Sequence, residues 1–336
     1  MKRNTDLDFI RAILIILMIL IHIVSFGNAY PQLKAGILSF MMPTFLIITG
    51  YLVNIEKTGR QMGNYLKCLA LPYVIMVIGF SVFSYYMPVR DGITELSLSQ
   101  IGEKIFITSI GPYWFIQTMI ICGTLYYFCF SGRNWNDLRR NYTKRDTYAS
   151  LFVFALTLLL ISETPALSAS AAAYYFIGVV IRQSKTEWNK LFRHEFFAII
   201  LWIYLLNHDD WYDWGSLAIV FSCWCCISTL LLLQHLLDAP ERFKDISPKI
   251  GKVAKVTNRI KDTLLYIGRN TLPIYLFHPI FTMAAKFYHP LFSWDPSEIC
   301  FALFTVILAI LGSIAIARIM EKTKLAYLFG KGKILR

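Results

Sequence analysis

Two ionisable residues near the start of the chain have types and a spacing suited to chemistry. Arg11 and His22 are separated by ten residues that carry no polar side chain. An α-helix rises about 1.5 Å and turns about 100° per residue, so eleven steps place both side chains on one face, roughly 16 Å apart along the axis. A guanidinium binds phosphates through paired hydrogen bonds, and an imidazole, with an ordinary pKa of about 6.5, suits a general base or a nucleophile. The pair therefore predicts an anion-binding end and a reactive end on one helix.

Arg11 and His22 are expected to be functional, because burying an ionisable side chain in an apolar segment costs free energy. An ionisable residue in a membrane helix usually faces the bundle interior or a wet cavity. Two structural alternatives stay open: Arg11 as an interfacial anchor that snorkels to lipid phosphates, and His22 as a polar residue that hydrogen-bonds a neighbouring helix. Asp8, three residues before Arg11, is placed to orient the guanidinium.

The composition of the chain indicates what positions this pair, a bundle of membrane helices. Of 336 residues, 56% are hydrophobic and only 16% are charged, against about a quarter charged in an ordinary soluble protein. We predict one all-α polytopic membrane domain over residues 1–336. Its ten apolar runs are about 9–26, 36–55, 65–87, 113–130, 148–161, 168–181, 196–206, 215–237, 264–288 and 299–317.

The basic residues predict the orientation of these ten spans. Lysines and arginines are enriched on the cytoplasmic side of membrane proteins. With both ends of the chain in the cytoplasm, 27 of the 33 lysines and arginines fall in inner segments and four in outer ones. The net charge of +12 is then explained without a nucleic-acid partner. We expect the first run to be a retained helix and not a signal peptide, because no small-residue cleavage site follows it in residues 25–31.

The seven cysteines predict neither disulfides nor a metal site. All of them lie in apolar stretches, without paired spacing across loops. Even the cluster of Cys223, Cys225 and Cys226 has adjacent members on different helix faces. We therefore expect small apolar thiols, no metal and no permanently bound cofactor.

Polar residues next to prolines inside the apolar runs are further candidates for a site. Prolines in membrane helices free carbonyls that line cavities or are satisfied by neighbours. The polar members of these patches are Thr44, Thr49 and Asn54 after Pro43, Gln117 after Trp114, and Asn270, Thr271 and His278 around Pro273 and Pro279. Hydrogen bonding between helices is the alternative interpretation for each of them.

Two segments between the runs also have alternative interpretations. The outer segment 207–214 is acidic and aromatic, which is typical of an interfacial belt or of a platform that stacks on sugar rings. The inner segment 238–262 carries seven lysines and arginines, which suit anionic membrane lipid or an anionic substrate.

Five short motifs occur in one order along the chain. They are the pair Arg11 and His22, the segment 43–51 (PTFLIITGY), the segment 71–73 (LPY), the segment 113–116 (YWFI) and the segment 274–279 (IYLFHP). Together they resemble the acyltransferase-3 family of polytopic membrane acyltransferases, which includes bacterial O-acetyltransferases of surface polysaccharides and of Nod factors. The resemblance covers essentially the whole chain.

The resemblance implies transfer of an acyl group, usually acetyl, from cytoplasmic acetyl-CoA to a hydroxyl of a glycan or lipid-linked glycan outside a bacterial inner membrane. It makes Arg11 and His22 the conserved pair of the first helix. From their chemistry we expect both to be catalytic, with His22 as general base or acyl carrier. The donor would contact Arg11, Lys67 and Asp8, and the candidate substrate-binding residues are Trp114, Gln117, Tyr275 and His278. Members commonly carry two spaced arginines just before the Leu-Pro-Tyr segment, whereas this chain has only Lys67 there.

Two other functions fit parts of the same pattern. In a transporter or flippase, Arg11 would grip a lipid phosphate and the histidines would relay protons, without acyl transfer. An inverted repeat would favour that function, and the sequence shows none. In a structural subunit the buried charges would only fix helix packing, and two such costly residues on one stripe argue against this.

Overall fold

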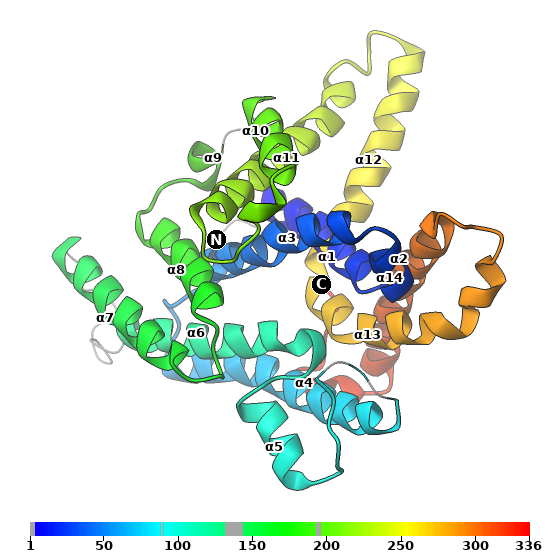
Figure 1. The fold of residues 1–336 in the computed structure, drawn as a ribbon. Helices are drawn as coiled ribbons and strands as arrows, with labels where there is room; N and C mark the ends of the chain where they lie inside the picture. The colour runs from blue at the N-terminus through cyan, green and yellow to red at the C-terminus, as the bar shows by residue number, and fades with distance from the viewer. Residues whose placement is uncertain (1–3, 88, 90, 132–143, 193–195) are drawn as a thin grey trace. The chain divides into compact units, whose positions relative to one another are not determined.

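The computed structural model describes residues 4–87, 89, 91–131, 144–192 and 196–336 (Figure 1). Over these ranges the regular elements are α-helices and short 3-10 helices with no strand, which confirms the predicted all-α class. The chain divides into two compact units. The first comprises Met1–Phe45, Thr186–Ile319 and Leu335–Arg336, and the second comprises Leu46–Lys185 and Met320–Ile334.

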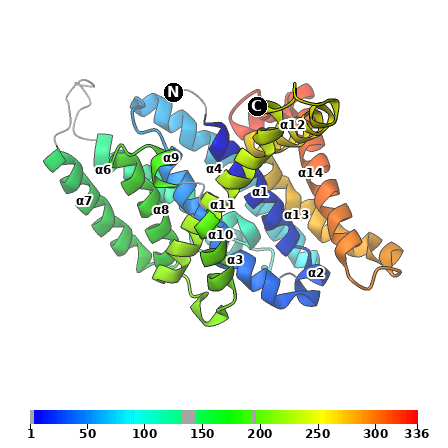
Figure 2. The same cartoon turned by 90° about the horizontal axis from the view of Figure 1, so that it is seen from above.

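The first unit contains the helix that carries Arg11. Its helices are α1 (Thr5–Ile21), α2 (Val24–Ala29), the first part of α3 (Pro31–Leu52), α9 (Trp188–Leu191), α10 (Phe196–Leu206), α11 (Leu217–Arg242), α12 (Pro248–Arg269), α13 (Thr271–Tyr288) and most of α14 (Ile299–Lys322). Helix α1 packs against α11, α12 and α13, and α11 packs against α10 and α12 (Figures 1 and 2). Its side chains Phe9, Leu14 and Met18 are fully buried. The core of this unit is therefore built around α1.

Local interactions explain where α1 begins and ends. The side chain of Asn4 caps the helix by accepting hydrogen bonds from two backbone N–H groups of the first turn. At the other end the N–H of His22 bonds to the carbonyl of Ile19 at 3.1 Å, and the extended residue Ile23 leads into α2. The predicted run 9–26 is thus helical, but the prediction of one continuous helix is wrong.

A glycine allows α1 and α12 to meet backbone to backbone. A Cβ added at Gly268 would lie only 1.7 Å from the carbonyl oxygen of Asp8, so no larger residue fits there without moving a helix. Helix α12 ends one residue later, and Asn270 separates it from α13. The predicted span 264–288 is therefore parts of two helices and not one. The prediction joins them because it is based on hydropathy alone.

The second unit is a further set of packed helices. It contains the end of α3, α4 (Gly59–Tyr86), α5 (Leu98–Phe106), α6 (Trp114–Ser131), α7 (Lys144–Ser162), α8 (Ala169–Gln183) and the short helices η1 (Gly111–Tyr113) and η4 (Leu325–Phe329). Helix α6 packs against α4, α7 and α8, with Tyr126, Phe154 and Tyr175 in the buried core (Figures 1 and 2). At Gly178 an added Cβ would lie 2.0 Å from the carbonyl oxygen of Ile47, so α3 and α8 also meet through a glycine.

Among the described residues, six helices are long and apolar enough to cross a membrane, which makes this a multi-pass membrane protein. They are Pro31–Leu52, Gly59–Tyr86, Gly111–Phe130, Arg145–Ser162, Leu217–Arg242 and Ile299–Lys322. The other four predicted runs are helical but shorter or less apolar. The number of ten spans and the cytoplasmic position of both termini stay predictions.

Two segments that the sequence predicts as loops contain helices. Residues 88–111, between the predicted runs 65–87 and 113–130, include α5. Segment 238–262 consists largely of the end of α11 and the first turns of α12. Some basic residues used to predict the orientation lie outside the described residues, namely Lys2, Arg3, Arg90, Arg133, Arg139, Arg140 and Arg193.

Candidate functional site

The guanidinium of Arg11 is held from two directions inside the first unit. Its Nη2 donates a hydrogen bond to Oγ1 of Thr271, the first residue of α13, and its Nη1 lies 3.8 Å from Oδ1 of Asp8. The Arg11 side chain is 25% exposed and that of Asp8 is 7% exposed. A snorkelling anchor extends its head toward lipid phosphates, whereas this head is turned toward a neighbouring helix. The geometry favours a positioned guanidinium over a lipid anchor.

The partner of Arg11 is presented by a fixed junction between α12 and α13. Asn270 is fully buried there, and its Nδ2 donates to the carbonyl oxygens of Tyr266 at 2.9 Å and Arg336 at 3.3 Å. Its Oδ1 accepts a hydrogen bond from the backbone N–H of Arg336 at 2.8 Å. Thr271 follows directly, so the residue that stops α12 also places the hydroxyl that Arg11 contacts. In the sequence both residues are visible only as polar neighbours of a proline.

The ring of His22 is oriented by the end of α1. Because the His22 N–H bonds to Ile19, the carbonyl of Met18 loses its usual backbone donor four residues later. The Nδ1 atom of His22 forms a hydrogen bond with this carbonyl oxygen at 2.7 Å. A carbonyl oxygen only accepts hydrogen bonds, so Nδ1 carries the proton and Nε2 is the acceptor nitrogen of the neutral ring.

His278 reaches the same state by a different route. It precedes Pro279 within α13, and a proline has no N–H to give to the carbonyl four residues earlier, which is that of Tyr275. His278 Nδ1 donates to this carbonyl at 2.8 Å, which again leaves Nε2 as the acceptor nitrogen. The residue is completely buried, and its Nε2 has no hydrogen-bond partner in the part of the chain that the structure describes.

The two imidazoles lie side by side. Their ring centroids are 5.3 Å apart with the planes at 74°, and the ring of Tyr275 lies 5.8 Å from that of His278. A buried acceptor without a partner costs about 1–3 kcal/mol, so the site favours a ligand with a hydrogen-bond donor. A hydroxyl supplies such a donor, whereas the carbonyl and sulfur of a thioester do not. The pair is therefore suited to hold and deprotonate an alcohol.

Helix α1 joins the two ends of this site. Because it is helical from Thr5 to Ile21, Arg11 and His22 are separated by roughly 16 Å along its axis. The structure brings five of the predicted site residues into the first unit, in two contact groups. These residues are Asp8 and Arg11 in one group and His22, Tyr275 and His278 in the other.

Three predicted site residues belong to the second unit. Lys67 is exposed on α4. Gln117 is buried on α6, and its Nε2 donates to the carbonyls of Phe106 at 3.3 Å and Ile107 at 3.2 Å, so it ties α6 to the end of α5. This contact is the interhelical role that the sequence leaves open as the alternative. The substrate contacts of Lys67, Trp114 and Gln117 stay predictions.

Segment 207–214, which the sequence predicts on the outer side, packs largely on its own neighbours. The rings of His208 and Trp211 stack with centroids 4.7 Å apart, and Tyr204 lies 4.4 Å from His208. The hydroxyl of Tyr212 donates to the carbonyl of Leu206 at 2.5 Å. These contacts fit an interfacial belt.

Among the described residues, no group of three or more histidine, cysteine, aspartate or glutamate side chains is arranged to hold a metal ion.

Comparison with known proteins identifies a family and a relative. Residues 4–318 match a family model described as an acyltransferase domain, a range that includes every predicted site residue. The chain is 24% identical over 299 residues to the nodulation protein NolL of Sinorhizobium fredii (strain NBRC 101917 / NGR234), over 82% of this chain and 77% of that protein. No solved structure matches the chain.

Proposed function

This chain belongs to the acyltransferase-3 family of membrane acyltransferases, and from that premise we propose that it moves an acyl group, acetyl in particular, from acyl-CoA to a hydroxyl. The donor comes from the cytoplasm, and the acceptor is a glycan or lipid-linked glycan at the outer face of the cell membrane. One observation carries the proposal. Helix α1 has an oriented guanidinium at one end and, at the other, an acceptor nitrogen beside a second imidazole whose Nε2 has no partner among the described residues.

Arg11 orients the donor. An acyl-CoA keeps its phosphates near cytoplasmic water while its thioester reaches a buried base, and its extended pantetheine arm is on the order of the roughly 16 Å between Arg11 and His22. A guanidinium presents its N–H donors in a planar fork that suits a phosphate. Asp8 and Thr271 fix this fork before the donor arrives, which lowers the entropy cost of binding. Lys67 is the second donor contact in the proposal, on the basis of the family motif alone.

His22 activates the acceptor. Its Nε2 takes the hydroxyl proton as the oxygen attacks the thioester carbonyl, forming the new C–O bond. The tetrahedral intermediate then expels the CoA sulfur, which receives the proton from His22, so the base is restored. In the other order of events, Nε2 attacks the thioester itself and expels the CoA thiolate. The acyl-imidazole then passes the group to the hydroxyl, whose proton goes to the thiolate, so His22 is restored. Both orders use the lone pair of Nε2. This nitrogen is unprotonated in the neutral ring because Nδ1 carries the proton that is donated to the Met18 carbonyl.

His278 positions the acceptor. Its Nε2 accepts a hydrogen bond from a hydroxyl group of the acceptor, which satisfies the buried nitrogen. Because Nδ1 is committed to the Tyr275 carbonyl, the ring has no N–H facing the site in its neutral form. The ring therefore favours a hydroxyl group next to His22, because a hydroxyl can donate a hydrogen bond to Nε2. It disfavours the carbonyl and sulfur of the acyl-CoA, which cannot.

The test is a comparison of glycans from cells with and without the gene. Surface glycans and lipid-linked glycans are analysed by mass spectrometry. We expect one acyl mass to be present only when the gene is present, and its position names the acceptor. Identical glycan masses in both cells contradict acyl transfer. If the masses are identical but a lipid-linked glycan accumulates on the inner side of the membrane, the chain is a flippase.

A further inference from the structure

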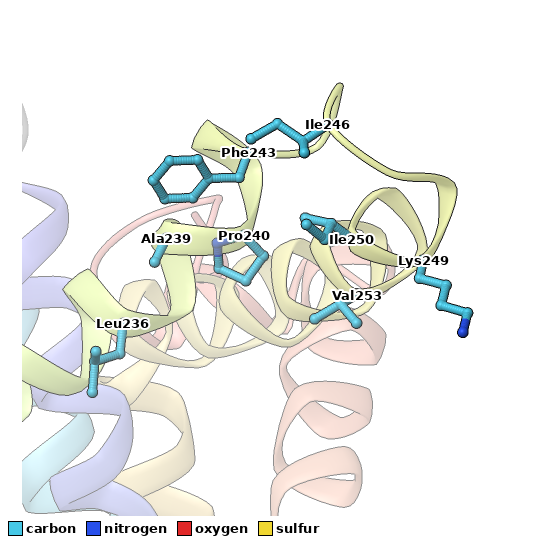
Figure 3. A pocket seen from close by; sticks show the side chains of 8 residues that line it. All are labelled: Leu236, Ala239, Pro240, Phe243, Ile246, Lys249, Ile250 and Val253. Atoms are coloured by element: carbon cyan, nitrogen blue, oxygen red, sulfur yellow. The ribbon is translucent and has the colours of Figure 1, made fainter.

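An apolar cleft opens where α11 ends and α12 begins (Figure 3). It has a volume of about 460 Å³, and six of its lining side chains are Leu236, Pro240, Phe243, Ile246, Ile250 and Val253. In Figure 3, Leu236 and Pro240 lie on α11, Ile250 and Val253 lie on α12, and Phe243 and Ile246 lie in the turn between the two helices. Lys249 lies at the rim and extends its amine outward. Residues 233–262 are called the α11–α12 hairpin below.

The apolar lining continues on the surface of the hairpin. Val253, Val256 and Ile260 are spaced by three and four residues, so they share one face of α12, and they are 51%, 55% and 47% exposed. Phe243 and Ile246, at the turn between the helices, are 52% and 72% exposed. A contiguous apolar surface of this kind marks a contact with a partner or with a membrane.

Unpaired cations stand beside this apolar surface. The hairpin carries seven lysines and arginines against four acids. Of the acids, Asp238 is engaged by Lys261 at 2.5 Å and Glu241 by Lys244 at 2.6 Å. Three further cations, Lys249, Lys252 and Lys255, form no ion pair with any acid of the described residues. The hairpin therefore combines an apolar face with a local excess of positive charge.

We propose that the α11–α12 hairpin binds an anionic phospholipid of the cytoplasmic leaflet. An acyl chain of the lipid lies in the cleft and along Val253, Val256 and Ile260, and the phosphate of the headgroup is bound by Lys249, Lys252 and Lys255. A helix with an apolar face and a lysine-rich flank is the form that interfacial membrane helices take. Lysine next to the cytoplasmic surface is attracted to anionic lipid.

The position of the hairpin favours lipid over the other occupants of an apolar groove. Helix α11 is one of the six described helices able to cross a membrane, and its last turns form one wall of the cleft, so the hairpin includes the end of a candidate membrane span. A second copy of the same chain would bring identical lysines together, which repel each other. An anionic headgroup complements them and lies at the same depth.

The test uses the full-length protein and does not involve acyl transfer, so it is independent of the proposed function. Hydrogen exchange of peptides across residues 236–256 is measured in nanodiscs of phosphatidylcholine, with and without phosphatidylglycerol. We expect phosphatidylglycerol to slow exchange in these peptides. Binding of the same lipid by native mass spectrometry should weaken about tenfold in the variant with Lys249→Gln, Lys252→Gln and Lys255→Gln.

Two matched variants keep this test decisive. Replacing the same three lysines with arginine should retain lipid binding, because the charge is kept. Changing Lys322, Lys324 and Lys333 to glutamine removes equal charge elsewhere and should leave lipid binding within twofold. The proposal is overturned by equal exchange with and without phosphatidylglycerol, by equal losses in both glutamine variants, or by protection that depends on dimerisation and not on lipid.

Discussion

The two ends of the site on α1 are built in opposite ways. At the Arg11 end the guanidinium contacts Asp8 and Thr271. Gly268 lets the backbone of α12 approach the backbone of α1 at Asp8. At the His22 end two backbone carbonyls orient the two rings, and Nε2 of His278 has no hydrogen-bond partner within the described ranges of the chain. A group that binds the donor is best held rigid before its ligand arrives, whereas the end where the acceptor is positioned and activated needs ring nitrogens open to a hydroxyl. This difference separates donor binding from chemistry.

The comparison is tested most strongly at the reactive end. His22→Ala removes the proton acceptor, so acyl transfer should fall about 10³-fold in kcat, as for loss of a general base. Rates are measured with purified protein in proteoliposomes and labelled acetyl-CoA. His289→Ala is the matched control, because His289 is paired with Glu298 at 2.8 Å outside the site. Equal rates for the wild type and His22→Ala would remove the catalytic role.

The packing behind the Arg11 end is tested next by Gly268→Ala. The added methyl would meet the Asp8 carbonyl at 1.7 Å and push α12 away from α1, so the free energy of unfolding should fall by about 1–3 kcal/mol. Melting temperature in detergent reports this loss. Gly63→Ala, where no atom lies within 4 Å of the new Cβ, should not lower the melting temperature. Equal melting temperatures in the two variants would show that α1 and α12 are not in close contact.

The binding end is tested by Arg11→Ala. Losing a charged hydrogen-bonding group should raise KM for acetyl-CoA about 10–100-fold and change kcat much less. The control is Lys286→Ala, which removes a cation near the end of α13 outside the site. A normal KM in Arg11→Ala would return Arg11 to the role of a lipid anchor.

The role of the second imidazole is tested by His278→Asn. The asparagine amide can still donate to the Tyr275 carbonyl but has no counterpart of Nε2, so KM for the acceptor should rise about tenfold. KM for acetyl-CoA should be unchanged. If both constants rise equally, His278 acts through the packing of α13 and not as an acceptor contact.

The smallest effect is expected at Thr271. Thr271→Val keeps the shape but removes the hydroxyl that accepts from Arg11, so KM for acetyl-CoA should rise about threefold to fivefold. Thr271→Ser restores the hydroxyl and should restore KM. A valine variant with normal donor affinity would mean that the Thr271 hydroxyl is not needed to orient the guanidinium.

The sequence predicts the parts of this site that depend on neighbouring residues. The apolar run between Arg11 and His22 defines a helix, and hydropathy along the chain predicts the all-α membrane class. The break after Ile21 is not predictable in this way, because no proline or glycine marks it. The break at Asn270 is missed when hydropathy alone defines the run 264–288, although Gly268, Asn270 and Pro273 are residue types typical of a helix end.

The contacts across the site depend on packing between distant helices. Thr271 is 260 residues from Arg11, and no periodicity in either helix relates the two. The same holds for His278 beside His22. Local chemistry does show in retrospect how each ring is fixed, because Pro279 frees the Tyr275 carbonyl that His278 uses. Residue type and spacing thus identify candidate groups, and the fold decides which of them meet.

The most direct test of the central claim is the structure of the protein with an acyl-CoA analogue in which a methylene group replaces the thioester sulfur. The measured quantity is the distance from the acyl carbonyl carbon to Nε2 of His22. We predict a distance within about 6 Å, which leaves room for one hydroxyl between base and carbonyl, with the donor arm in contact with Arg11. An acyl group bound away from His22, or a donor that does not touch Arg11, would contradict the account.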